Sequence, residues 1–205
     1  MKKAFALLSI CALIWVALLA NSHHAGAMST GRTNFSGNPV TTGGATCTTC
    51  HVGGVAPEVE INGPTTIFVG NQLPYSISIQ GGQIGNSALP NASAGYNVSA
   101  DGGDLDVANA TAPCLSDESQ CSFNPILGNN ELTHTAPKLP AVSSDTVTFD
   151  FLFTAPDEAG TVIIYGAGNS ANGDGGSAGD MSTATTLTVT VVEPEAQLYL
   201  PLLDN

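Results

Sequence analysis

Apolar and polar residues alternate in short runs through most of the chain after residue 57. Successive side chains of a β-strand point to opposite faces, so this alternation predicts half-buried strands. Turn-forming residues separate the runs, and Asp101–Asp104 between two of them predicts a hairpin connection. The sequence shows no amphipathic helix pattern of useful length. The pattern therefore predicts an all-β, antiparallel β-sandwich of about seven or eight strands over residues 58–193, with strands near 59–61, 66–69, 75–79, 94–100, 105–108, 146–153, 161–165 and 183–192.

The two ends of the chain differ from this pattern. Lysines at residues 2–3 precede an almost wholly apolar run over residues 4–20, and residues 25–27 (Ala-Gly-Ala) fit a cleavage site. We expect residues 1–27 to be a secretory signal peptide, because the apolar run is short for the alternative of a membrane anchor. The apolar tail at residues 194–205 is also too short to cross a bilayer, so no stable span is expected after cleavage.

Residues 28–57 lack a periodic apolar pattern and are rich in Gly, Thr and Asn, which predicts an irregular N-terminal arm. Within this arm Cys47, Cys50 and His51 form Cys-x-x-Cys-His, the attachment signature of a c-type haem. Two thiols three positions apart can both reach one porphyrin, and the adjacent histidine can ligate its iron. We expect one covalent haem c, with Cys47 and Cys50 as thioether links and His51 as proximal ligand. A redox dithiol, a local disulfide and half a zinc site are the alternatives.

The arm has too few large apolar residues to shield a porphyrin, so we expect the haem to lie against the sandwich as well. The sixth iron ligand has few candidates. The histidines at residues 23–24 leave with the leader, so His134 remains beside His51. His134 is the candidate distal ligand, Met181 is the alternative and Met28 a weaker one; an open or water-bound site is the third option.

Two further cysteines, Cys114 and Cys121, bracket a short polar segment. In an exported protein such a pair is typical of a disulfide. An unstrained bridge of this size would stabilise the fold by about 2 to 3 kcal/mol.

Two acidic, glycine-rich segments offer several side-chain oxygens on turn-forming backbone. Oxygen ligands of this kind suit calcium, although neither segment matches an EF-hand loop. Clusters of Gly, Asn and Asp between strands are also ordinary turns. A calcium site is therefore a secondary prediction, with the candidate ligands Asp101, Asp104, Asp106, Asn172, Asp174 and Asp180.

The chain is strongly acidic, with seventeen Asp and Glu residues against four Lys and Arg and a formal charge of −13. Such a surface repels nucleic acids and anionic membranes, so a nucleic-acid partner is excluded. The sequence also shows no nucleophile elbow, phosphate loop, HExxH motif or catalytic Ser/His/Asp spacing. An electron carrier is therefore expected rather than an enzyme.

Thr46–Gly54 in the arm, followed after the strands by Tyr165–Asn169 and Asn172–Gly175, form a characteristic order of motifs. This order resembles that of the choice-of-anchor V domain proteins, a family of bacterial secreted proteins related to the Reelin domain. The resemblance implies an immunoglobulin-like (Reelin-like) β-sandwich behind a haem-carrying arm, and it supplies architecture more than activity. The segment between Cys114 and Cys121 and the C-terminal tail depart from the family pattern. The resemblance covers most of residues 30–193 and rests on Gly31-Arg32-Thr33, Thr46–Gly54, Thr133-His134-Thr135, Phe153–Pro156, Tyr165–Asn169, Asn172–Gly175 and Gly179-Asp180.

These observations together favour a secreted, periplasmic or cell-surface, mono-haem protein related to c-type cytochromes, with electron transfer as its role. The alternative is an extracellular binding or matrix module with a structural haem or a Cys-x-x-Cys disulfide. A redox or gas sensor is a third hypothesis. The sequence does not identify the redox partner or the oligomeric state.

Overall fold

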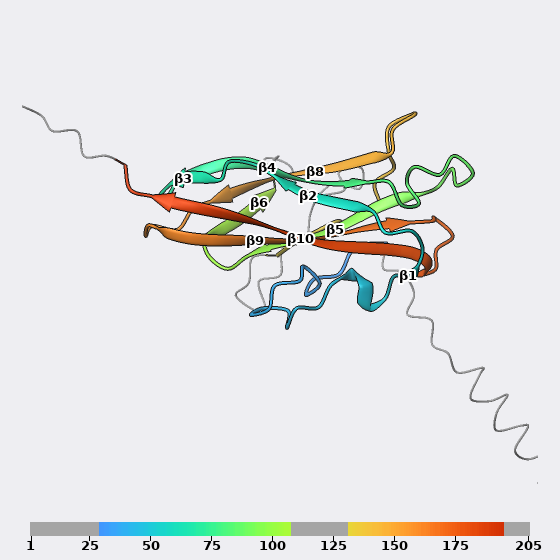
Figure 1. The fold of residues 1–205 in the computed structure, drawn as a ribbon, viewed down its shortest axis with the longest axis horizontal. Coiled ribbons are helices and arrows are strands. Elements are labelled where there is room, and N and C mark those ends of the chain that lie inside the picture. Colours follow the sequence, from blue (N-terminus) through green and yellow to red (C-terminus); the bar gives the residue numbers. More distant parts are fainter. Residues whose placement is uncertain (1–28, 108–130, 195–205) are drawn as a thin grey trace, which may run out of the picture.

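The computed structural model describes residues 29–107 and 131–194, and these form an all-β fold (Figure 1). The all-β sandwich predicted from the alternating pattern is confirmed. The described residues contain more strands than predicted, because several pairings involve only two or three residues and leave no alternation to detect. The elements are η1 (Cys47–Thr49), β1 (Val52–Gly53), β2 (Glu58–Asn62), β3 (Thr66–Phe68), β4 (Gln72–Gln80), β5 (Ser93–Ala100), β6 (Asp104–Val107), β7 (Glu131–Thr133), β8 (Thr146–Thr154), β9 (Gly160–Ala171) and β10 (Ala178–Val192).

The strands form two sheets. The first has the order β1-β10-β9-β5-β7, with β3 also paired to β10, and the second has the order β2-β4-β8-β6. Most neighbours are antiparallel, as predicted, but the short strands β1 and β3 pair with β10 in parallel. The predicted hairpin at Asp101–Asp104 is wrong, because β5 pairs with β7 and β9 whereas β6 pairs with β8. This segment instead carries the chain from one sheet to the other.

The hydrophobic core lies between the two sheets. On β8 every second residue is buried, and Phe149, Phe151 and Phe153 are fully enclosed. Tyr75 stacks on Phe151 with ring centroids 5.9 Å apart, and Tyr96 lies 4.4 Å from Phe149. Aromatic contacts of this kind add to the free energy gained by burying apolar surface.

Strand β5 departs from simple alternation, since seven of its eight residues are buried. Tyr96 and Val98 face the core, whereas Asn97 and Ser99 on the opposite face are only 2% and 1% exposed. The N-terminal arm covers this second face. Figure 1 shows the arm, coloured blue to cyan, on the side of β9 and β10 that faces away from β2, β4 and β8.

Glu131 at the start of β7 fastens the arm to the sheet. Its carboxylate accepts the backbone N–H groups of Asn34 and Phe35 at 2.6 and 3.1 Å, and the Asn97 amide at 2.9 Å. Burial is the largest influence on this group and raises the pKa of its carboxyl, although the hydrogen bonds act in the opposite direction.

The end of the arm is fastened by β1. Val52 and Gly53 pair with the start of β10, and the Gly54 N–H donates to the Asp180 carbonyl at 2.9 Å. A Cβ atom at Gly54 would lie 2.3 Å from the Gly179 carbonyl oxygen, so only glycine permits this close approach. The arm is thus packed onto the six-stranded sheet at both ends.

The predicted leader, the Cys114–Cys121 disulfide and Met28 lie outside the described residues. Within residues 29–107 and 131–194, the structure contains no helix with the length and apolar character that crossing a bilayer requires.

Candidate functional site

The Cys-x-x-Cys-His motif forms a single tight turn. Residues 47–49 are a 3-10 helix, and the Cys47 carbonyl accepts the N–H groups of Cys50 and His51 at 3.2 and 3.0 Å. In a 3-10 turn side chains three residues apart lie one above the other, so both cysteines face the same way. Both are free thiols. The local geometry is therefore the one that attachment to a single planar group requires.

The turn opens onto a cavity of about 560 Å³ between the arm and the six-stranded sheet. Its volume falls in the range of small-molecule and cofactor sites. Cys47, Cys50 and His51 line it together with His134, although His134 is far away in the sequence. The remaining lining comes from the arm, from β5 and β9, and from the segments after β7 and β9, and includes Arg32, Phe35, Asn97, Leu139, Asn169 and Gly173.

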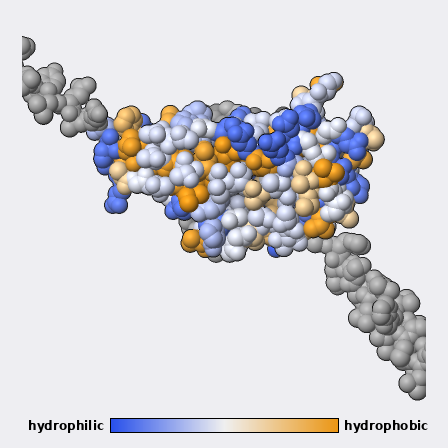
Figure 2. Space-filling model, in the orientation of Figure 1, coloured by the Kyte–Doolittle hydropathy of each residue, from blue (hydrophilic) through white to orange (hydrophobic). Residues whose placement is uncertain are grey.

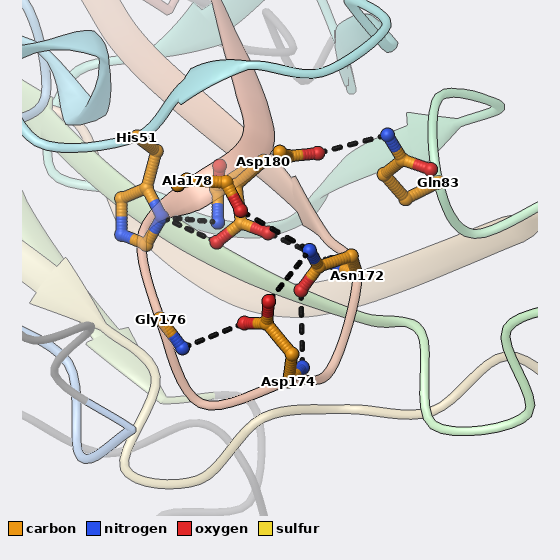
Figure 3. A network of polar contacts seen from close by, with 9 residues as sticks. His51, Gln83, Asn172, Asp174, Gly176, Ala178 and Asp180 are labelled. Carbon is orange, nitrogen blue, oxygen red and sulfur yellow. Dashed lines mark hydrogen bonds and ion pairs between the residues drawn. The ribbon is translucent and has the colours of Figure 1, made fainter.

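His51 is held by a buried carboxylate. Its Nδ1 lies 2.8 Å from Oδ2 of Asp180, which is 0% exposed, while the His51 side chain is 17% exposed (Figure 3). The other carboxylate oxygen of Asp180 accepts the Asn172 N–H at 2.8 Å. A carboxylate only accepts hydrogen bonds, so the Nδ1 atom of His51 donates and Nε2 keeps its lone pair. Histidines that ligate metals through Nε2 are oriented in the same way.

Asn169 lies beside this pair and lines the cavity. Its Nδ2 is 3.3 Å from the His51 Nδ1, and the residue is only 6% exposed. Its Oδ1 has no hydrogen-bond partner among the described residues. A buried amide oxygen without a partner carries a free-energy cost unless something else satisfies it.

The surroundings of Cys47 disfavour a redox dithiol. Its Sγ donates to Oδ1 of Asn97 at 3.6 Å, and burial raises the pKa of the thiol to about 12. Reactive dithiols need the opposite, a thiolate stabilised near neutral pH. A zinc site also lacks support, because the described residues contain no group of three or more His, Cys, Asp and Glu placed to hold a metal ion.

His134 follows β7 and packs edge-on against the backbone of β5. A Cβ atom at Gly95 would lie 2.4 Å from the His134 ring, so the absence of a side chain there makes room for the imidazole. The backbone N–H of Tyr96 donates to the His134 Nδ1 at 3.1 Å. His134 and His51 therefore line the same cavity from two different parts of the fold.

Met181 has a different placement. It follows Asp180 on β10 and so points to the opposite face of the sheet, and it is not among the residues that line the cavity. The structure therefore does not bring this alternative ligand to the Cys-x-x-Cys-His turn.

The six residues proposed for calcium have local roles. Asp101 accepts the Ile163 N–H at 2.7 Å, and Asp174 accepts the Gly176 N–H at 2.7 Å and the Asn172 amide at 3.1 Å. Asp180 binds His51, and Asp104 and Asp106 lie on β6 in the other sheet. These carboxylates do not converge within the described part of the chain.

Three residues of the site were not predicted in their roles, namely Asp180 as the partner of His51, Glu131 as the anchor of the arm, and Asn169 in the cavity wall. Asp180 is 129 positions from His51, and no local pattern connects them. Asn169 lies in a segment on which the family resemblance rests, and Asp180 is one of the candidate calcium ligands, but neither signal indicates a contact with His51.

No protein-family model matches the chain, and no curated protein gives a significant match. Among solved structures, the cohesin module of a family 33 glycoside hydrolase from Clostridium perfringens is similar at 11% identity with a TM-score of 0.41, covering 67% of this chain and 98% of the module. The major subunit of aggregative adherence fimbriae type I from Escherichia coli is similar at 15% identity with a TM-score of 0.35, covering 69% and 99%. A PapD-like domain of human CEP192 is similar at 10% identity with a TM-score of 0.33, covering 67% and 87%.

Proposed function

We propose that this protein is an exported mono-haem c-type protein that transfers electrons. Cys47 and Cys50 would form the thioether links and His51 would ligate the iron through Nε2. The observation that carries the proposal is the His51–Asp180 hydrogen bond of 2.8 Å, made beside two thiols on one turn that face a cavity. A motif alone can occur by chance, but a motif histidine held by a buried carboxylate is arranged for ligation.

The residues present fit a haem in three respects. The donor set is two thiols and an imidazole, which is the set that c-type haem attachment uses. The lining of the cavity of about 560 Å³ combines apolar residues, including Phe35 and Leu139, with polar ones such as Arg32 and Asn97. Asn169, whose Oδ1 has no hydrogen-bond partner among the described residues, is one of the polar residues of this lining.

A bound haem supplies an iron that alternates between the ferric and ferrous states. The chain supplies orientation and electrostatics. Asp180 keeps the proton of His51 on Nδ1 and strengthens the donor character of Nε2, which favours the ferric state and lowers the reduction potential. The arm and the sheet together limit the access of water to the ring.

The proposal also includes export from the cytoplasm and a redox partner that binds the acidic surface of this protein. The leader-like residues 1–27 and the Cys114 and Cys121 pair both favour an oxidising compartment outside the cytoplasm. With a formal charge of −13, the protein would attract a redox partner with a basic surface. An arm followed by a β-sandwich also supports the proposed relation to the choice-of-anchor V proteins.

The test is to produce the full chain in a host able to attach haem, and to combine a pyridine haemochrome spectrum with the intact mass. We expect one covalent haem per chain. The double variant Cys47→Ser/Cys50→Ser should lose it, and the matched control Cys114→Ser/Cys121→Ser should keep it. Colourless protein whose mass shows Cys47 and Cys50 oxidised to each other would reject the haem.

The alternative is an extracellular binding module in which the haem or a disulfide is structural. One observation favours it: within residues 29–107 and 131–194, no other element packs on the outer face of the four-stranded sheet, which carries the exposed acidic residues Glu58, Glu60 and Asp150. A Cys47→Ser/Cys50→Ser variant that remains folded and still binds a polymer or protein would support this alternative over electron transfer.

A further inference from the structure

Arg32 is the basic residue of the cavity. The chain has only four Lys and Arg residues, and two of them, Arg32 and Lys138, are among the described residues. Arg32 lines the cavity, whereas Lys138 does not. The Nζ atom of Lys138 instead donates to the Thr148 carbonyl at 2.6 Å and lies 5.1 Å from the centre of the Phe149 ring. Of the two described basic residues, only Arg32 is therefore placed to meet a ligand in the cavity.

The backbone around Arg32 is fastened to the six-stranded sheet. The Arg32 carbonyl accepts the Asn97 amide at 2.6 Å, and the same amide donates to Glu131 at 2.9 Å. Gly31, the preceding residue, has a φ of +70°, and a Cβ atom there would collide with the His134 carbonyl. Only glycine permits this approach. The starting point of the Arg32 side chain is thus fixed at the edge of the cavity.

The guanidinium of Arg32 lies against a side chain of the cavity lining. Its Cζ atom is 5.4 Å from the centre of the Phe35 ring, and Phe35 also lines the cavity. A guanidinium over an aromatic face gains a cation–π attraction. Arg32 is exposed, so a ligand can reach it. The only ion pair formed between two described residues is that of His51 with Asp180, so none of the described carboxylates pairs with Arg32.

An arginine that pairs with none of these carboxylates is unexpected in a chain with a formal charge of −13. That charge repels acidic ligands, so an acidic group at the cavity needs a cation close to it. We propose that Arg32 binds a carboxylate of the molecule that occupies the cavity. This inference rests on the proposed function for the identity of that molecule. Haem carries its propionate carboxylates on the edge opposite its vinyl groups, so Cys47 and Cys50 would hold one edge and Arg32 the other.

The chemistry of the side chain defines the class of ligand. A planar guanidinium presents parallel N–H groups that match the two oxygens of a carboxylate, which a lysine ammonium cannot do. Phe35 and Leu139 in the same lining suit an apolar ring. The cavity is therefore expected to prefer a flat apolar molecule with a carboxylate at its edge over the same molecule with that charge removed.

The first experiment separates recognition of the carboxylate from covalent attachment. The full-length Cys47→Ser/Cys50→Ser variant is titrated with ferric protoporphyrin IX and with its dimethyl ester, which has the same ring and no carboxylate. We expect the acid to bind more tightly than the ester. Adding Arg32→Gln should weaken binding of the acid by about fivefold to tenfold and leave binding of the ester nearly unchanged. Arg32→Lys should recover part of the loss.

The ester serves as the folding control, because a misfolded variant would lose affinity for both porphyrins. Lys138→Gln removes the same charge away from the cavity and should leave the ratio of acid to ester affinity unchanged. An Arg32→Gln variant that keeps the wild-type ratio would overturn the inference while leaving the haem proposal standing. If neither porphyrin binds, both proposals are wrong. Binding of the acid that depends on Arg32, in a chain that never acquires covalent haem, would reject the proposed function and support this inference.

The second experiment uses the haem-loaded protein. A guanidinium near the ring disfavours the ferric state, which carries one more positive charge than the ferrous state. Arg32→Gln should therefore lower the reduction potential, and Arg32→Lys should lower it less. Equal potentials in wild type and Arg32→Gln would place the guanidinium away from the haem and contradict the inference.

Discussion

The two outer faces of the sandwich differ more than the two sheets that carry them. The four-stranded sheet presents Glu60 and Asp150 to solvent, whereas the six-stranded sheet buries Asn97, Asn169 and Asp180 under the arm. Figure 2 shows the most hydrophilic side chains mainly over the layer of β2, β4 and β8, and paler shades over the arm. The outward-facing polar side chains of the six-stranded sheet thus form part of a buried site, whereas those of the four-stranded sheet remain in contact with solvent. The covering arm makes the difference.

The strongest way to test this comparison is to remove a carboxylate from each face. Asp180→Ala leaves the His51 and Asn172 N–H groups without a buried acceptor, so we expect a loss of about 3 kcal/mol in the free energy of unfolding. Glu60→Ala on the uncovered face should stay within about 0.5 kcal/mol of wild type. Denaturant unfolding of both variants measures the difference.

The conservative variant Asp180→Asn separates the electrostatic effect of this residue on His51 from its role in stabilising the arm. It keeps the shape and removes the negative charge, so in the haem-loaded protein the reduction potential should become more positive. An unchanged potential in a folded Asp180→Asn protein would show that the carboxylate only stabilises the arm.

A smaller effect is expected from adding one methyl group beneath His134. Gly95→Ala places a Cβ atom 2.4 Å from the ring, and we expect a cost of about 2 kcal/mol from overpacking. Gly160→Ala on β9 meets no atom within 4 Å and should change stability by no more than about 0.5 kcal/mol. Equal melting temperatures for the two variants would mean that the ring does not lie on Gly95.

The smallest expected effect is on the pH dependence of the free energy of unfolding. Burial raises the pKa of Glu131 from its ordinary value of 4.5, so the folded state holds this proton more tightly than the unfolded chain. The resulting stability is complete below that ordinary value and is lost as the pH rises through the raised pKa. Glu131→Gln should therefore flatten the fall in unfolding free energy across this window. Glu60→Gln removes the same charge from an exposed site, and equal slopes in the two variants would contradict the assignment.

Much of the sandwich could be predicted because its long strands have a strict pattern. Residues 146–153 and 75–79 alternate so regularly that strand and buried face both follow from the sequence. The β5 strand was also predicted, but the burial of both its faces was not, since Asn97 and Ser99 are buried by the arm rather than by the core. Strands as short as β1 and β7, which were not predicted, have no period to detect.

The residues of the candidate site also divide into those that the sequence indicates and those that only the fold brings together. The cysteines and His51 were found because they are adjacent in sequence, and His134 was found because histidines are scarce. Asp180 was predicted only as a candidate calcium ligand, because its contact with His51 depends on the parallel pairing of β1 with β10. The contact of the Tyr96 N–H with the His134 ring follows the end of the β5–β7 ladder, which no sequence pattern indicates.

The two-residue strand β1 also limits how this chain can vary in evolution. It places the Cys-x-x-Cys-His turn beside the start of β10, so that the His51 imidazole contacts the Asp180 carboxylate. Inserting or deleting one residue between His51 and Gly54 would turn the imidazole toward the other side of the chain. Homologues that keep the same chemistry should therefore have a constant spacing here. Their length differences should fall in surface turns away from this pairing.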